Sequence, residues 1–170
     1  MERTGKARFM SSPPVVNHPP CLWGFPPPWA GGWGEDIQGV YAKVLIRGVE
    51  MELRWIPPGG FLMGSAETEA GRWDAEGPQH GVTLTRGFWL GATPVTQEQW
   101  QALMGSNPSE SKNSSHSVEN IVWNNAVEFC RRLTEAAKVA NHCPPGIEFR
   151  LPTEAEWEYG CRAGTLTAFN

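Results

Sequence analysis

The side chains best suited to polar recognition lie in a long acidic segment, AETEAGRWDAEGPQHG, at residues 66–81. The segment shows neither helical nor strand periodicity, and ordering a loop of this length costs conformational entropy. Loops that bear this cost more often bind something than act only as connections. We therefore expect this segment to be functional, with Trp73 standing alone among Asp74, Glu76 and His80. The alternative is an exposed acidic loop with Trp73 tucked under it.

Four cysteines are the other residues able to do chemistry: Cys21, Cys130, Cys143 and Cys161. Their spacings are wide and contain no CxxC, so the sequence indicates neither a zinc site nor a thioredoxin-like motif. No His, Lys or helix N-terminus is placed beside Cys130 or Cys161 to stabilise a thiolate. We expect both to pack as small apolar residues, and Cys143 to be more exposed and incidental. No catalytic residue is predicted.

His116 is the remaining candidate for a metal ligand. It lies in SNPSESKNSSHSVEN, residues 106–120, where turn-forming residues predict a surface loop. No carboxylate or second histidine stands at ligand spacing from it, so a solvated side chain is favoured. No metal ligand is predicted.

The best-marked helix near these residues begins after Thr153. Glu156 completes a capping box with Thr153, and Gly164 offers a left-handed stop. Trp157 and Tyr159 are large aromatic residues for so short a helix, and such residues require burial on more than one side. The pattern predicts a wedge inside a core.

Two further helices are predicted to support the core. One begins after Thr96, with Gln99 completing its capping box, and ends at Gly105. The other begins near Asn124 or Asn125. Its periodicity places one apolar stripe against the core, formed by Ala126, Phe129, Cys130, Leu133 and Ala137.

Short strands account for much of the remaining order. Alternating residues from Val40 to Trp55 predict two strands joined near Gly48, followed by a short buried strand at 61–63. This arrangement is typical of an antiparallel meander. Residues 82–84 and 88–90 predict two more strands around a tight turn at Arg86-Gly87.

Composition and charge restrict the function. The 170 residues include 14 Lys and Arg against 18 Asp and Glu, which gives a net charge of −4. This balance disfavours nucleic acid and anionic membranes as partners. No apolar run approaches the roughly 18 residues needed to span a bilayer, and no segment resembles a signal peptide. We therefore predict a cytoplasmic location with reduced cysteines.

Residues 1–34 differ from the rest in being rich in Pro and Trp. Proline denies this leader both helix and central strand, so we predict a largely irregular segment. Its apolar residues favour contact with the domain surface from about Trp29 onwards. A proline-rich ligand for a partner's groove is the less favoured alternative. Residues 35–170 are assigned to one domain.

Four sequence blocks carry a resemblance to a known family: WIPPGGFLMGS (55–65), EGPQHGVTLTRGFWLGATPVTQEQW (76–100), VENIVWNNAVEFCRRL (118–133) and RLPTEAEWEYGCRAGT (150–165). In this order they resemble the formylglycine-generating enzymes, also called sulfatase-modifying factors. The resemblance covers roughly Arg54 to the end of the chain. It implies an α+β fold, an irregular variant of the C-type-lectin-like fold with short antiparallel strands and about three helices.

The resemblance also implies a function. Members of the family use copper and molecular oxygen to convert a cysteine of a sulfatase-type sequence to formylglycine, and calcium is a further possible cofactor. The segment 66–81 would contribute to the groove that takes the substrate peptide, and the expected partner is a protein or peptide. Its candidate groove residues are Trp73, Asp74, Glu76 and His80, with Glu76 and His80 foremost. Cys130 and Cys161 match family cysteines that in some members pair with cysteines further along the domain.

The family domain continues beyond the position of Asn170, and its paired catalytic cysteines and calcium-binding loops lie in that continuation. We therefore expect residues 35–170 to be the N-terminal portion of such a domain and to be inactive alone. A sibling branch with a His-rich iron site loses support, because no H-x3-H-x-E triad is present. A non-catalytic lectin-like binding module, or a gene fragment, remains an alternative.

Overall fold

The computed structural model describes residues 27, 29–143 and 146–165. The predicted leader therefore lies largely outside the described residues. The strands are β1 (Gly32–Asp36), β2 (Gly39–Ile46), β3 (Val49–Ile56), β4 (Gly59–Met63), β5 (His80–Leu84) and β6 (Phe88–Gly91). The helices are α1 (Gln97–Met104), α2 (Trp123–Val139) and α3 (Glu154–Arg162), with a short 3-10 turn at Asp74–Glu76.

The hairpin of β2 and β3 forms the centre of the larger sheet, as the alternating pattern predicts. Arg47 and Gly48 both adopt positive φ values, 51° and 82°. This geometry matches the twist of a two-residue hairpin turn. Ile46 pairs with Val49 across that turn. One face of the hairpin is buried through Val40, Ala42, Val44, Ile46, Met51 and Leu53.

The sheet order is β1-β2-β3-β6, so the predicted meander stops at β3. The chain leaves the sheet at Pro57-Pro58, since proline cannot donate to the ladder. β4 then pairs with β5 in a separate two-stranded sheet. The strands on either side of Arg86-Gly87 are therefore not partners of each other. A Cβ at Gly87 would lie 2.4 Å from a Trp55 ring atom, and this close approach brings β6 onto β3.

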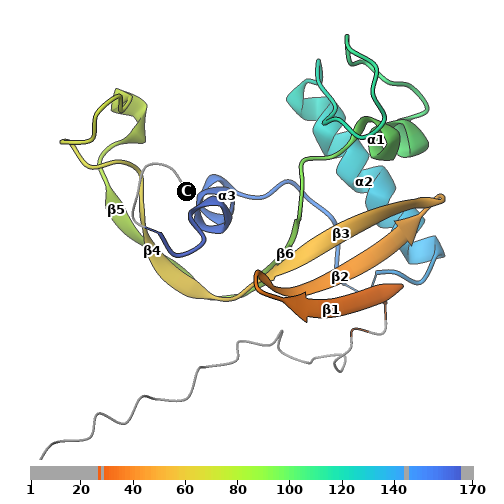
Figure 1. The fold of residues 1–170 in the computed structure, drawn as a ribbon, viewed down its shortest axis with the longest axis horizontal. Helices are drawn as coiled ribbons and strands as arrows, with labels where there is room; N and C mark the ends of the chain where they lie inside the picture. Colours follow the sequence, from red (N-terminus) through yellow and green to blue (C-terminus); the bar gives the residue numbers. More distant parts are fainter. Residues whose placement is uncertain (1–26, 28, 144–145, 166–170) are drawn as a thin grey trace, which may run out of the picture.

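Helices α1 and α2 cover the buried face of the four-stranded sheet (Figure 1). The predicted capping box of Thr96 and Gln99 is present, and Gly105 closes α1 in the left-handed conformation. α2 begins at Trp123, one residue before the predicted start. The rings of Trp100 and Phe129 stack with centroids 5.2 Å apart. These helices and β2–β3 supply every member of the buried apolar cluster among the described residues.

The β4–β5 pair forms an arm that projects from the sheet, and α3 packs beside it (Figure 1). Thr153 and Glu156 form the predicted capping box. The prediction of a buried wedge is wrong, because no residue of α3 is buried and Trp157 is 58% exposed. A nine-residue helix against a two-stranded sheet has only one covered side. Residues 61–63 are likewise half-buried or exposed, not buried as predicted.

The end of the predicted leader is anchored to the domain. The rings of Trp29 and Trp89 meet edge to face at 5.5 Å, and His142 Nδ1 contacts the Trp29 carbonyl. This confirms the expected surface contact from about Trp29. Irregular structure does not extend to residue 34, because residues 32–34 already pair with β2. Cross-strand pairing overrides the local effect of the nearby prolines.

Candidate functional site

The four candidate residues lie in one loop between β4 and β5, which we call the acidic loop (residues 64–79), or at its end. Trp73 and Asp74 begin the 3-10 turn, Glu76 ends it, and His80 opens β5. All four are exposed. Trp73 is 75% exposed, so the alternative that it is tucked under the loop is wrong. The sequence segment therefore presents an indole ring and polar groups to solvent at the far end of the arm.

Local hydrogen bonds give the acidic loop a defined shape. The Trp73 N–H donates to Glu76 Oε1 at 3.3 Å. His80 Nδ1 lies 2.9 Å from the Pro78 carbonyl. Because a carbonyl only accepts, Nδ1 donates in this contact. The Ser65 N–H donates to the Glu76 carbonyl at 3.2 Å and closes the base of the loop.

Helix α3 holds the base of this loop through Gly64. The Gly64 N–H donates to Glu158 Oε1 at 2.8 Å, and its carbonyl accepts from Arg162 at 2.8 Å. Glu158 and Arg162 form an ion pair at 2.6 Å, with about a fifth of each side chain exposed. Neither residue is a candidate on the sequence alone. The i, i+4 spacing of Glu158 and Arg162 was the available signal, but such spacing usually marks an ordinary helix-surface pair.

The acidic loop carries four carboxylates against one cation, and none of the four is in an ion pair with another described residue: Glu67, Glu69, Asp74 and Glu76. The ion pairs between described residues lie elsewhere, in the four-stranded sheet, in α2 and around α3. Arg72 is the loop's own cation, and its Nε donates to Ser65 Oγ at 3.2 Å. The loop therefore keeps a local negative potential at its surface.

Around α3, by contrast, a carboxylate is neutralised. The Arg150 guanidinium donates to both oxygens of Glu156 at 2.6 and 2.7 Å. This bond is the main cause that lowers the pKa of Glu156 to about 2, with the Thr153 N–H contributing and partial burial opposing. Glu156 is thus committed to holding α3 and is not available to a ligand.

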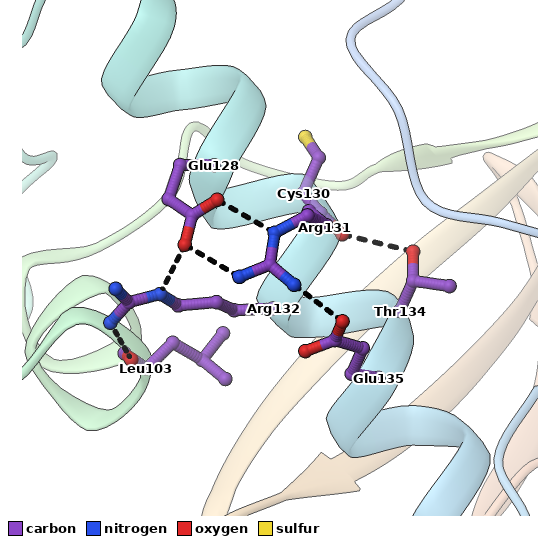
Figure 2. A network of polar contacts seen from close by, with 7 residues as sticks. All are labelled: Leu103, Glu128, Cys130, Arg131, Arg132, Thr134 and Glu135. Atoms are coloured by element: carbon purple, nitrogen blue, oxygen red, sulfur yellow. Dashed lines mark hydrogen bonds and ion pairs between the residues drawn. The ribbon is translucent and has the colours of Figure 1, made fainter.

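The described cysteines do not offer a copper site. Copper(I) prefers thiolates, yet burial raises the pKa of Cys130 and of Cys143. In Figure 2 the Cys130 thiol points away from the guanidinium groups of Arg131 and Arg132, which bind Glu128 instead. Cys143 is half-buried and Cys161 is exposed, so the predicted ranking of their exposure is wrong. Cys161 follows the exposed Trp157 by four residues in α3.

The described residues likewise form no recognisable site for calcium or another metal. Among the residues that the structure describes, no three His, Cys, Asp or Glu side chains gather in a metal-binding arrangement. His116 is exposed and contacts the Asn113 side chain at 3.0 Å, as expected for a solvated histidine. It borders a polar pocket of about 320 Å³ beside Gln97. The buried Gln97 amide already binds protein groups at both ends, so the pocket offers a ligand no unpaired buried group.

No described helix has the length and apolar character needed to cross a bilayer. This finding concerns the helices alone. The acidic loop, supported by α3, therefore remains the site with the most groups directed at solvent and the best-defined geometry.

Comparisons with known proteins agree with this architecture. A family model described as "Sulfatase-modifying factor enzyme 1-like domain" matches residues 47–169. A chaperone protein LppX from Paenibacillus barcinonensis is 34% identical over 110 residues, covering 49% of this chain and 38% of that protein. The formylglycine-generating enzyme of Mus musculus is 38% identical over 85 residues, covering 50% of this chain and 18% of the enzyme.

Among solved structures, variable protein 1 of Treponema denticola superposes with a TM-score of 0.59 at 26% identity. The match covers 74% of this chain and 57% of that one. The chain thus spans well under two thirds of the length of the relatives it matches. The family model covers most of the chain, beginning at the Arg47 turn and including all three helices. The chain therefore belongs to the family of sulfatase-modifying factor enzyme 1-like domains.

Proposed function

We propose that the chain binds a protein or peptide partner through the acidic loop. The observation that carries this proposal is the exposed Trp73 ring, held beside carboxylates that have no ion-pair partner among the described residues. An exposed tryptophan is costly to leave in water and is a frequent anchor in protein interfaces. The shape of the loop is fixed before binding, which lowers the ordering cost of association.

The chemistry of the loop favours a partner segment that carries Arg or Lys. A guanidinium placed over the Trp73 ring gains a cation–π interaction, and Asp74 and Glu76 can pair with neighbouring cations. The exposed ring of His80 adds a polar group at the β5 end of the loop. A protein partner is consistent with the name of the relative LppX, a chaperone protein.

The test is binding of a fluorescent, unstructured Gly/Ser peptide that carries several Arg residues. We expect measurable binding that weakens as salt rises, because the attraction is partly electrostatic. The same peptide with Glu in place of Arg should not bind. Trp73→Ala should weaken binding by about two- to fivefold, the range expected for an exposed cation–π contact. Asp74→Asn combined with Glu76→Gln should reduce the salt dependence.

Trp157→Ala is the matched control. This substitution also removes an exposed indole, but from α3 and not from the acidic loop. It should leave binding unchanged. Equal weakening by Trp73→Ala and Trp157→Ala, or equal binding of the Arg and Glu peptides, would contradict the proposal.

A second function, oxidation of a protein cysteine, is favoured by the 38% identity to the mouse formylglycine-generating enzyme. In that case the acidic loop would contact the substrate chain beside the reacting cysteine. We propose that the chain lacks this activity on its own, because no three His, Cys, Asp or Glu side chains gather in a metal-binding arrangement among the described residues, and burial disfavours the thiolates of Cys130 and Cys143. Oxygen uptake measured during copper titration, with a cysteine-containing sulfatase-type peptide present, should remain at the background rate.

A further inference from the structure

The acidic loop is joined to α3 through the backbone of a single residue. Both polar groups of Gly64 are engaged, the N–H by Glu158 and the carbonyl by Arg162. The two helix residues follow Gly64 by 94 and 98 positions in the chain. Their mutual ion pair fixes the two side chains relative to each other. Gly64 follows Met63 at the end of the β4–β5 ladder, and its carbonyl also accepts from Gln79 Nε2 at 3.2 Å. The α3 pair adds the attachment that joins this point to the helix.

Gly64 passes this position on to the recognition residues. Its φ is +85°, and a Cβ there would lie 2.2 Å from the Glu76 carbonyl, so the backbone of the two residues is in close contact. The adjacent Ser65 is 3% exposed and donates its N–H to the same carbonyl. Ser65 Oγ also accepts from Arg72 Nε. Trp73 and Asp74 lie between these two points of attachment.

Apolar packing cannot set this geometry. Within residues 66–80 the structure describes no buried side chain. The nearest apolar contact joins α3 to β4, where the rings of Tyr159 and Phe61 lie 5.3 Å apart. That contact holds α3 against β4 but involves no residue of the acidic loop. Hydrogen bonds are directional and therefore decide where the loop points.

We propose that Glu158 and Arg162 are positioning residues that orient Trp73 and its neighbouring carboxylates for partner binding. The inference rests on the proposed function. The pair touches no partner itself. It acts through Gly64, and its charge-assisted bonds are stronger than bonds between neutral groups.

The first measurement is the ¹⁹F NMR signal of Trp73 in protein labelled with 5-fluorotryptophan, assigned with Trp73→Phe. Glu158→Ala and Arg162→Ala should each shift or broaden this signal, because the base of the loop is released. Glu158→Gln keeps an acceptor for the Gly64 N–H and should restore most of the native signal. This readout needs no partner, so it tests the positioning role even if the Arg peptide fails to bind.

The second measurement is binding of the Arg peptide. Glu158→Ala and Arg162→Ala should each weaken binding by about fivefold or more, the low end of typical coupling between two sites. The reversed pair, Glu158→Arg with Arg162→Glu, can rebuild an ion pair on α3. It should not restore binding, because an arginine at position 158 cannot accept from the Gly64 N–H.

Glu156→Gln is the control for the stability of α3. It breaks the Arg150 pair on the same helix but makes no contact with Gly64. It should leave both the Trp73 signal and peptide binding near their native values. The proposal is overturned if Glu158→Ala leaves the Trp73 signal unchanged, or if Glu156→Gln has the same effect on it. Full recovery of binding by the reversed pair would also overturn it.

Discussion

Two regions of the molecule differ in the interactions within them: the four-stranded sheet with α1 and α2, and the arm with α3. The four-stranded sheet with α1 and α2 contains the buried apolar cluster. In the arm, α3 has no buried side chain, and it is joined to β4 by the contact of Tyr159 with Phe61 and to the acidic loop by the hydrogen bonds of Glu158 and Arg162 with Gly64. Apolar burial is non-directional and supplies most of the folding free energy, whereas hydrogen bonds specify direction. In this molecule the buried apolar cluster and the hydrogen bonds that shape the acidic loop therefore lie in separate parts of the chain.

The largest expected difference between the two regions is in the free energy of unfolding lost when one aromatic side chain is removed from each. Phe129 is 3% exposed and stacks on Trp100, so Phe129→Ala should lower the free energy of unfolding by about 3–5 kcal/mol. Trp157→Ala on α3 should cost about 0.5 kcal/mol or less, as at other surface sites. Urea denaturation followed by circular dichroism measures both. Similar losses for the two variants would remove the distinction.

A smaller contrast is expected from the two capping boxes. Thr96 caps α1 in the core half, and Thr153 caps α3 beside the arm. Loss of a cap typically costs about 1 kcal/mol. Thr96→Ala should lower the global stability by this amount. Thr153→Ala should instead accelerate hydrogen exchange in α3 and in β4–β5, while β2–β3 exchange at the native rate.

Threonine-to-serine substitutions keep the capping hydroxyl and serve as controls at both positions. If Thr153→Ala speeds exchange in β2–β3 as much as in β4–β5, then the two halves open as one cooperative unit.

The smallest effect is expected on acidification. The pKa of Glu156 is about 2, below its ordinary value of 4.5, chiefly because of the bond from Arg150. A lowered pKa in the folded state means that the stabilisation is present above the ordinary value and is lost as the pH falls towards 2. The free energy of unfolding should therefore begin to fall below about pH 4.5, while the α3 amide resonances should titrate with a midpoint near pH 2. Glu156→Gln should remove this dependence, and an unchanged profile in that variant would assign the shift to another group.

The features that the sequence predicted correctly are those with local causes. The capping boxes of Thr96 and Thr153 depend on residues three positions apart, and the alternation in β2 and β3 follows from one buried face. The family resemblance added the overall fold. The acidic loop was also recognised as a candidate site, because its composition and length are local properties.

The incorrect predictions depend on contacts between distant residues. The exposure of Trp157 follows from what α3 packs against, which its own pattern does not specify. β5 pairs with β4 rather than with β6, although β6 is nearer in the sequence. The contacts of Gly64 with Glu158 and Arg162 join residues more than ninety positions apart. No periodicity within one segment carries that information.

One consequence of the strand order concerns how such a domain can change. Ile56 and Phe88 are partners across β3 and β6, so the chain departs for the arm and returns at neighbouring points of one ladder. The arm is therefore an insertion between two paired strands. The entropy cost of closing such an insertion depends only weakly on its length. We therefore expect that the segment between β3 and β6 can be replaced or changed in length while these two strands stay paired.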